Sequence, residues 1–276
     1  MAQLKVACVQ LNVGSDLDLN LEQACARVRE AAAAGAQFIA LPEYAVLLDG
    51  SGRVMRSRSP EESKHPALPA FATLARATRA WLLVGSLTVQ GDDGRMVNRS
   101  YLICADGSIV ARYDKIHMFD VTLPGGKVIR ESSAYSAGGS AVVAATPWGA
   151  LGMSVCYDLR FPQLYRTLAK AGAVMLVVPS SFQRETGPAH WQVLLRARAI
   201  ENAAWVIAPA MCGDHANGRS TYGHSIVIDP WGRVTAELDA QPGVMVADID
   251  TDEAARVRAM LPSLEHDREF KLERSG

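Results

Sequence analysis

Short apolar runs of the buried-strand type alternate with helix-like segments along most of this 276-residue chain. The clearest runs are F-I-A-L-P at 38–42, W-L-L-V-G-S-L at 81–87 and V-M-L-V-V-P at 174–179. Amphipathic helices are expected at 17–34 and 188–203, between such runs. Strands that are apolar throughout predict an α/β protein in which helices cover the faces of the sheets.

The order of the elements favours mixed sheets over a purely parallel one. The turn A-D-G at 105–107 separates two strand-like runs and indicates a hairpin, whereas other strands are separated by helices and need crossovers. A Gly-rich stretch at 121–141 is expected to be irregular. Because the chain contains no linker, low-complexity tract or solenoid repeat, we expect residues 1–276 to form one domain.

Three reactive side chains follow apolar runs directly. Glu43 follows F-I-A-L-P, Lys115 follows S-I-V-A-R-Y-D, and Cys156 follows A-L-G-M-S-V. Enzymes of the α/β class place their chemistry at the carboxyl ends of strands, so these side chains are expected to converge. A carboxylate, an ammonium and a thiol are the groups needed for thiol-based acyl transfer.

Each group has an expected role in that reaction. A thiol with an ordinary pKa of about 8.5 is mostly protonated at neutral pH and needs a proton acceptor, for which Glu43 is the candidate. Glu43 would then protonate the leaving amine and activate the hydrolytic water. Lys115 and the backbone N–H of Tyr157 would stabilise the oxyanion. Taken singly, each residue also has a structural interpretation. Glu43 fits a helix cap or a loop ion pair. Lys115 fits a solvated charge, and Cys156 fits a packed small residue.

Composition argues against several other classes of protein. A net charge of −1 gives no basic surface for nucleic acid, and no run of about 18 apolar residues predicts a membrane span. The N-terminus lacks a signal-peptide pattern, so a cytoplasmic protein is expected. Five cysteines without a C-x-x-C pair argue against a disulfide scaffold and a zinc finger. No Gly-rich nucleotide motif occurs, so we expect no cofactor.

An ordered set of motifs covering essentially the whole chain resembles the carbon–nitrogen hydrolases of the nitrilase superfamily. These motifs are V-A-C-V-Q-L, L-P-E-Y, Y-D-K-I-H, C-Y-D-L-R-F-P, T-G-P-A-H-W, R-A-R-A-I-E-N, Y-G-H-S and D-P-W-G. The resemblance implies a four-layer α-β-β-α sandwich with two mixed sheets, a Glu43-Lys115-Cys156 triad and no metal. It also implies a homodimer or higher homo-oligomer built through the outer helices, with a tail at about 262–276 extended over a partner subunit.

The same resemblance assigns a supporting role to Glu131 in I-R-E-S-S, close to Lys115 and Cys156. It would orient Lys115 or the substrate and assist proton transfer. Two carboxylates beside one ammonium are expected to raise the pKa of at least one carboxyl by repulsion and desolvation.

The resemblance implies an amidase that acts on small α-keto acid amides, although the triad alone does not separate amides from nitriles. Deaminated glutathione and 2-oxoglutaramate are the two candidate substrates, and the stretch 212–225 favours the first. Arg160 is the candidate anchor for the substrate carboxylate, with Phe182 and Thr186 lining the pocket. Arg160 also fits a structural ion pair with a nearby acid, and Arg219 with His215 would contact a longer, peptide-like substrate.

Three other classes stay open at this point. A papain-like hydrolase would need a histidine base, for which His190 and His224 are available. A redox sensor would use Cys156 as a single activated thiol. A scaffold of the same fold without enzymatic activity is also compatible with the sequence, because fold does not determine function.

Overall fold

Two six-stranded sheets lie face to face in the computed structural model, which describes residues 3–123, 125–126 and 128–275. The first sheet has the order β16-β1-β2-β3-β4-β5. Its strands are β1 (Gln3–Gln10), β2 (Phe38–Ala40), β3 (Trp81–Gln90), β4 (Met96–Ile103), β5 (Ile109–Asp114) and β16 (Gly243–Asp250). Neighbours among β1, β2 and β3 run parallel, and the outer pairs run antiparallel.

The second sheet repeats this plan in the order β15-β14-β11-β10-β9-β8. Its strands are β8 (Val142–Thr146), β9 (Gly149–Met153), β10 (Met175–Val177), β11 (Trp205–Ala208), β14 (Ile226–Ile228) and β15 (Val234–Glu237). Here β9, β10 and β11 form the parallel centre, and antiparallel strands flank them. Both sheets are therefore mixed, as predicted.

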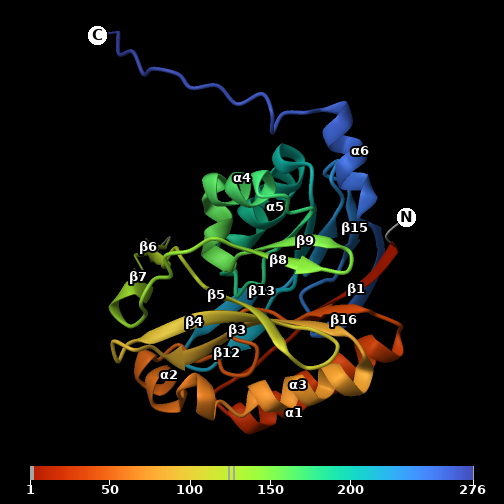
Figure 1. The fold of residues 1–276 in the computed structure, drawn as a ribbon. Helices are drawn as coiled ribbons and strands as arrows, with labels where there is room; N and C mark the ends of the chain where they lie inside the picture. Colours follow the sequence, from red (N-terminus) through yellow and green to blue (C-terminus); the bar gives the residue numbers. More distant parts are fainter. Residues whose placement is uncertain (1–2, 124, 127, 276) are drawn as a thin grey trace.

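Helices cover the outer face of each sheet (Figure 1). Helices α1 (Leu17–Ala33) and α3 (Ala67–Thr78) lie below the first sheet in that view, and α4 (Pro162–Lys170) and α5 (Gly187–Asn202) lie above the second. Proline at the first turn of α4 and of α5 costs no hydrogen bond, because the N–H groups there have no partner within the helix. No helix among the described residues is long and apolar enough to cross a bilayer.

Two hydrophobic clusters hold these layers together. One packs α1 and α3 against the first sheet, with Val28 and Phe71 meeting Val9 and Ile39. The other fills the space between the sheets and continues to α4 and α5, from Val6 and Leu83 through Met153 and Leu176 to Trp191. The predicted four-layer α-β-β-α sandwich is confirmed.

The short elements at the rim of the sandwich differ most from expectation. The stretch expected to be irregular holds the hairpin of β6 (Asp120–Thr122) and β7 (Val128–Arg130), a 3₁₀ turn η2 (Glu131–Ser133) and further loop. A second hairpin, β12 (Cys212–His215) with β13 (Arg219–Tyr222), was not predicted. Neither was helix α2 (Gly52–Arg58). These segments are short and polar, so their sequences carry no clear apolar periodicity. The remaining elements are η1 (Glu62–Lys64), η3 (Cys156–Arg160) and α6 (Asp252–Met260).

Gly85 lets β3 approach two loops that carry polar side chains at the end of the sandwich. The β3–β4 register shifts between Val84 and Leu87, which places Gly85 in an irregular part of the strand. A Cβ atom at Gly85 would lie 2.0 Å from the Leu41 carbonyl oxygen and 2.5 Å from Pro179 Cβ. Only glycine fits there without backbone movement.

We expect Gly85→Ala to lower the free energy of unfolding by about 1–3 kcal/mol, the usual cost of overpacking a closed site. Urea denaturation followed by circular dichroism measures the change. Gly14→Ala is the matched control, because a Cβ atom at Gly14 would meet nothing within 4 Å. Equal stability of the two variants would contradict the close approach described for Gly85.

Candidate active site

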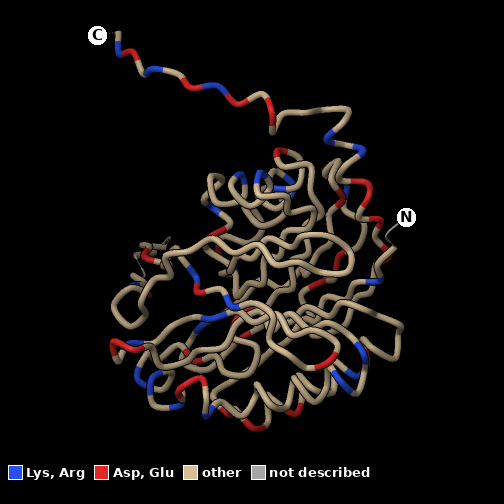
Figure 2. The backbone as a smooth tube through the Cα atoms, in the orientation of Figure 1, with Lys and Arg blue, Asp and Glu red and all other residues tan. Residues whose placement is uncertain are grey.

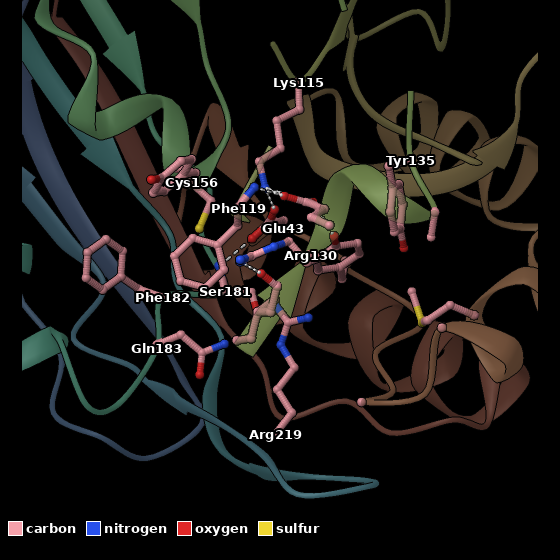
Figure 3. A pocket seen from close by; sticks show the side chains of 18 of the residues that line it. Glu43, Lys115, Phe119, Arg130, Tyr135, Cys156, Ser181, Phe182, Gln183 and Arg219 are labelled. Carbon is pink, nitrogen blue, oxygen red and sulfur yellow. Dashed lines mark hydrogen bonds and ion pairs between the residues drawn. The ribbon is translucent and has the colours of Figure 1, made fainter. Parts of the chain in front are cut away.

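The three polar groups predicted to converge do meet at one end of the sandwich (Figure 3). Glu43 follows β2 of the first sheet and Lys115 follows β5 of the same sheet. Cys156 follows β9 of the second sheet and begins η3. The facing sheets therefore deliver a carboxylate and an ammonium from one side and a thiol from the other.

Lys115 lies between two carboxylates. Its Nζ is 3.0 Å from Glu43 Oε1 and 2.9 and 2.8 Å from the two carboxylate oxygens of Glu131. The side chains of Lys115 and Glu43 are 2% and 1% exposed, and that of Glu131 is 7% exposed. Charges this deeply buried persist only when they are paired and hydrogen-bonded.

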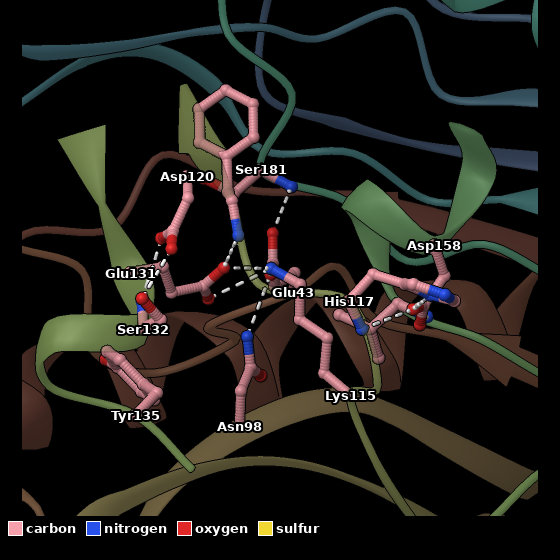
Figure 4. Close-up of polar contacts among 12 residues, drawn as sticks. Glu43, Asn98, Lys115, His117, Asp120, Glu131, Ser132, Tyr135, Asp158 and Ser181 are labelled. Carbon is pink, nitrogen blue, oxygen red and sulfur yellow. Dashed lines mark hydrogen bonds and ion pairs between the residues drawn. The ribbon is translucent and has the colours of Figure 1, made fainter. Parts of the chain in front are cut away.

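Glu43 is held at both carboxylate oxygens. Besides Lys115, Oε1 accepts a hydrogen bond from Asn98 Nδ2 at 2.9 Å, and Oε2 accepts one from the Ser181 backbone N–H at 2.8 Å (Figure 4). Asn98 lies on β4 of the first sheet, whereas Ser181 follows β10 of the second. The Glu43 carboxylate thus joins the two sheets.

Both carboxylate oxygens of Glu131 also accept further hydrogen bonds, from residues of the loops at the rim of the sandwich. Its Oε1 accepts a hydrogen bond from the Tyr44 hydroxyl at 3.0 Å, and its Oε2 accepts one from the Phe119 backbone N–H at 2.6 Å. Tyr44 adopts a positive φ of 60°, which a residue with a side chain rarely does. The backbone that turns Glu43 into the site therefore also directs the Tyr44 hydroxyl to the second carboxylate.

Cys156 sits in a turn whose geometry exposes its thiol to the charged cluster. Its φ is 49°, in the left-handed region, and its N–H donates to the Pro179 carbonyl oxygen at 3.0 Å. Burial and the negative charge of Glu43 raise the pKa of the Cys156 thiol well above its ordinary value, and the Lys115 ammonium only partly opposes them. The resting thiol is therefore protonated at neutral pH.

A buried carboxylate shapes the turn after the thiol. Asp158 accepts hydrogen bonds from the Val155 N–H at 2.9 Å, from the Tyr113 hydroxyl at 2.6 Å and from the His117 N–H at 3.0 Å. These bonds fix η3. The N–H of Tyr157 lies in the first turn of that helix, where backbone donors have no partner within the helix. This is the position expected for an oxyanion donor.

The electrostatic balance differs from expectation at Glu131. Burial alone would raise the pKa of the Glu131 carboxyl, but the Lys115 ammonium outweighs it and the net shift is downward. Burial likewise opposes the charge on Lys115, yet Glu131 and Glu43 together raise the pKa of Lys115. The predicted rise in the pKa of at least one carboxyl is not seen at Glu131, because attraction to the shared ammonium and the hydrogen bonds to the carboxylate exceed the effect of desolvation.

The charged cluster opens into a cavity of about 320 Å³, a size found for sites that hold small molecules. The predicted residues that line it are Glu43, Lys115, Glu131, Cys156, Tyr157, Arg160, Phe182 and Thr186. The sequence therefore named residues from several separate segments that the fold brings together.

Arg160 forms no ion pair with an acid among the described residues, which was the alternative to its role as a substrate anchor. Its guanidinium lies 5.4 Å from the Phe182 ring centroid, and both terminal nitrogens are 3.3 Å from His190 Nδ1. Of the nearby acids, Asp158 is hydrogen-bonded within the turn, and Glu201 pairs with Arg198 at 2.8 Å. Arg160 thus presents a guanidinium to the cavity with no carboxylate partner among the described residues.

Sequence reasoning missed several polar groups of the site. Asn98 and Ser181 hold Glu43, and Gln183 lines the cavity beside Phe182. Of these residues, Ser181 would have been the easiest to predict, because it follows a buried strand as Cys156 does. Arg219, suggested only for a longer substrate, lines the same cavity and donates from Nη2 to Ser181 Oγ at 2.9 Å.

The family model for carbon-nitrogen hydrolases matches residues 5–259. The chain belongs to this family. It is a hydrolase of carbon–nitrogen bonds other than peptide bonds. The resemblance found in the sequence motifs is confirmed.

Named relatives of this carbon–nitrogen hydrolase span nearly its whole length. Deaminated glutathione amidase of Synechocystis sp. (strain PCC 6803 / GT-S) is 39% identical over 265 residues, which cover 94% of the chain and 96% of the relative. The human protein of that name is 39% identical over 275 residues, covering 95% and 82%. The structure of Saccharomyces cerevisiae Nit3, a member of branch 10 of the nitrilase superfamily, matches with a TM-score of 0.84 at 29% identity, covering 94% of each chain.

The papain-like alternative finds no base among the described residues of the cavity. The cavity-lining residues described include no histidine to serve as the base of a papain-like mechanism. His224 instead contacts the Tyr222 carbonyl oxygen through Nδ1 at 2.8 Å, and His190 contacts Arg160. No described group of three or more His, Cys, Asp and Glu residues is arranged to hold a metal ion.

We expect Glu43→Gln to shift the pH dependence of Cys156 alkylation toward lower pH. The Glu43 carboxylate raises the pKa of the thiol, so removal of its charge lets the thiolate form at lower pH. Iodoacetamide labelling between pH 6 and 11, followed by peptide mass spectrometry, gives the profile for Cys156. Glu61→Gln, on the surface in an ion pair with Lys64, is the control. A shift toward higher pH would contradict the assigned contact.

Proposed function

We propose that Glu43, Lys115 and Cys156 are the catalytic triad of an amidohydrolase that works through a cysteine thioester, with Glu131 supporting Lys115. The convergence of the Glu43 carboxylate, the Lys115 ammonium and the Cys156 thiol on one cavity carries this proposal. A protonated thiol needs a nearby base, and we assign that role to Glu43.

Attack begins when the Cys156 thiol transfers its proton to Glu43 as sulfur bonds to the amide carbon. The carbonyl oxygen becomes an oxyanion, which the Lys115 ammonium and the Tyr157 N–H stabilise. Glu43 then gives its proton to the leaving nitrogen, the C–N bond breaks, and an amine departs from a thioester on Cys156. Proton transfers of this kind contribute about 10²- to 10⁴-fold to rate.

The contacts of Lys115 couple the proton transfer to oxyanion binding. Its three N–H donors are directed to Glu43 and to both oxygens of Glu131 in the resting protein. A protonated Glu43 is a weaker acceptor than a carboxylate, so the transfer releases one N–H of Lys115 when the oxyanion forms. Glu131 keeps its hold on Lys115 throughout.

Hydrolysis of the thioester reverses these roles. Glu43 takes a proton from water as the water oxygen attacks the thioester carbon, and Lys115 again faces the oxyanion. Collapse of this intermediate breaks the C–S bond and releases the carboxylic acid. Glu43 returns its proton to sulfur, which restores the resting thiol and carboxylate.

We propose deaminated glutathione as the substrate, with 2-oxoglutaramate as the alternative. The Synechocystis and human relatives carry the first name at 39% identity. Both compounds bear an α-keto carboxylate, and we assign its bidentate binding to Arg160, which lines the cavity and has no carboxylate partner among the described residues, with Phe182 and Thr186 around the acyl chain. Deaminated glutathione has a second carboxylate, on the departing cysteinyl-glycine, and a second guanidinium, Arg219, lines the cavity.

We propose further that this single-domain protein is cytoplasmic and forms a homodimer or higher homo-oligomer. The outer face of α5 exposes Val193 at 66% and Ile200 at 53%, which supports contact through the outer helices. The tail leads away from the body of the protein (Figures 1 and 2), and its Phe270 is 90% exposed. An apolar side chain on an extended tail suits contact with a partner subunit, and Gly276 lies outside the described residues.

We expect the purified protein to hydrolyse deaminated glutathione with a kcat/KM at least about tenfold above that for 2-oxoglutaramate. A second carboxylate offers one more charge-assisted hydrogen bond, and a factor of ten corresponds to about 1.4 kcal/mol. Chromatographic detection of 2-oxoglutarate reports both reactions. Simple nitriles and N-carbamoyl amino acids complete the screen, and preference for either of them would reject the proposed substrate.

We expect Glu43→Gln, Cys156→Ser and Lys115→Arg each to lower kcat at least about 100-fold while the fold is retained. Arginine keeps the charge at 115, but its planar guanidinium does not fit the position of a compact ammonium between two carboxylates. Circular dichroism and thermal melting verify folding. Glu61→Gln is again the control, and near-normal turnover by any of the three variants would reject that residue's role.

A further inference from the structure

Two polar atoms on the wall of the cavity lack partners. Arg219 Nε and Gln183 Oε1 are buried and form no hydrogen bond with any described residue. Both side chains extend toward the cavity that holds Cys156 (Figure 3). Buried donors and acceptors without partners are uncommon and costly, so two cavity-lining side chains that each keep one unsatisfied polar atom indicate a place where a ligand could complete their hydrogen bonds.

The backbone that carries these atoms is firmly built. Gln183 pairs with Thr221 in an antiparallel bridge, and the Tyr222 N–H donates to the Phe182 carbonyl oxygen at 2.9 Å. At the tip of the same hairpin, Asn217 Nδ2 donates to Asp49 Oδ1 at 2.5 Å. The side chains of Gln183 and Arg219 therefore project from adjoining segments whose relative position is fixed.

Arg219 brings a positive charge that no described carboxylate neutralises directly. Its Nη2 donates to the hydroxyl of Ser181 at 2.9 Å, and its guanidinium lies 5.3 Å from the centroid of the Tyr44 ring. A buried guanidinium held by a hydroxyl and an aromatic ring retains the capacity to bind an anion.

The contacts of Arg219 place it on the side where the leaving group must lie. The leaving nitrogen has to face Glu43 to receive its proton. The Glu43 carboxylate accepts the N–H of Ser181, and the hydroxyl of Ser181 accepts the guanidinium of Arg219. Arg160 instead lies over the rings of Tyr157 and Phe182. The two guanidinium groups thus have different neighbours in the cavity, and we assign Arg160 to the acyl part of the amide and Arg219 to the amine part.

We propose that Arg219 and Gln183 form a subsite for a dipeptide leaving group. Arg219 binds the terminal carboxylate of the departing peptide, and Gln183 Oε1 accepts its peptide N–H. This inference rests on the proposed amidase function and deepens it, because it names the residues that select an amide with a peptide-like amine over a primary amide.

The test compares three substrates on the wild type and on Arg219→Gln. These are deaminated glutathione, its C-terminal N-methylamide, which lacks the glycine carboxylate, and 2-oxoglutaramate, which lacks the dipeptide. In the wild type, kcat/KM should fall about 10- to 100-fold from deaminated glutathione to the N-methylamide, the usual effect of a lost charge-assisted hydrogen bond. In Arg219→Gln this difference should shrink to less than about threefold, mainly through a higher KM for deaminated glutathione.

Further variants separate binding from other effects. Gln183→Leu should raise KM for deaminated glutathione relative to that for 2-oxoglutaramate. Arg184→Gln is the control, because Arg184 pairs with Asp214 at 2.9 Å and does not line the cavity. Arg160→Gln should impair all three substrates together, since all share the α-keto carboxylate.

Two results would overturn the proposed subsite. One is an Arg219→Gln variant that still distinguishes deaminated glutathione from its N-methylamide as strongly as the wild type does. The other is an equal loss of kcat on all three substrates, which would make Arg219 a group that acts on the catalytic carboxylates. Failure of the proposed function looks different, because the wild type itself would then hydrolyse none of the three.

Discussion

The ammonium of Lys115 between the carboxylates of Glu43 and Glu131 is the interaction on which the site depends. All three side chains are almost completely buried, and buried charges persist only when they are paired and hydrogen-bonded. The same carboxylates accept backbone N–H groups from Ser181 and Phe119, which belong to different layers of the fold. One buried charge cluster therefore aligns the second sheet and the rim with the first sheet.

A protonated nucleophile is a direct result of this arrangement. The cluster carries two negative charges and one positive charge near the sulfur, and burial adds to the cost of a thiolate. Cys156 thus lies in a left-handed turn as a protonated thiol. In the proposed mechanism it loses its proton to Glu43 only as it attacks, so the proposed base is as important as the proposed nucleophile.

Much of the fold and the three central residues were predictable from sequence, because apolar strands that end in Glu43 and Cys156 leave a strong local pattern. Lys115 follows a less apolar run, so its pattern is weaker, and Glu131 gained its assignment from motif resemblance alone. The supporting bonds from Asn98, Ser181 and Tyr44 were not predictable, since they depend on how separate layers pack. The β12–β13 hairpin that carries Arg219 was not predicted because its strands are short, mostly polar and without apolar alternation.

The position of Glu131 ties the shape of the cavity to the charge network. Glu131 begins η2 directly after the β6–β7 hairpin, and Ile129 and Arg130 of that hairpin line the cavity. A substitution that displaced Ile129 or Arg130 would therefore also disturb the carboxylate that holds Lys115. The fit of a bound molecule and the alignment of the ammonium are thus set by one continuous segment of the chain.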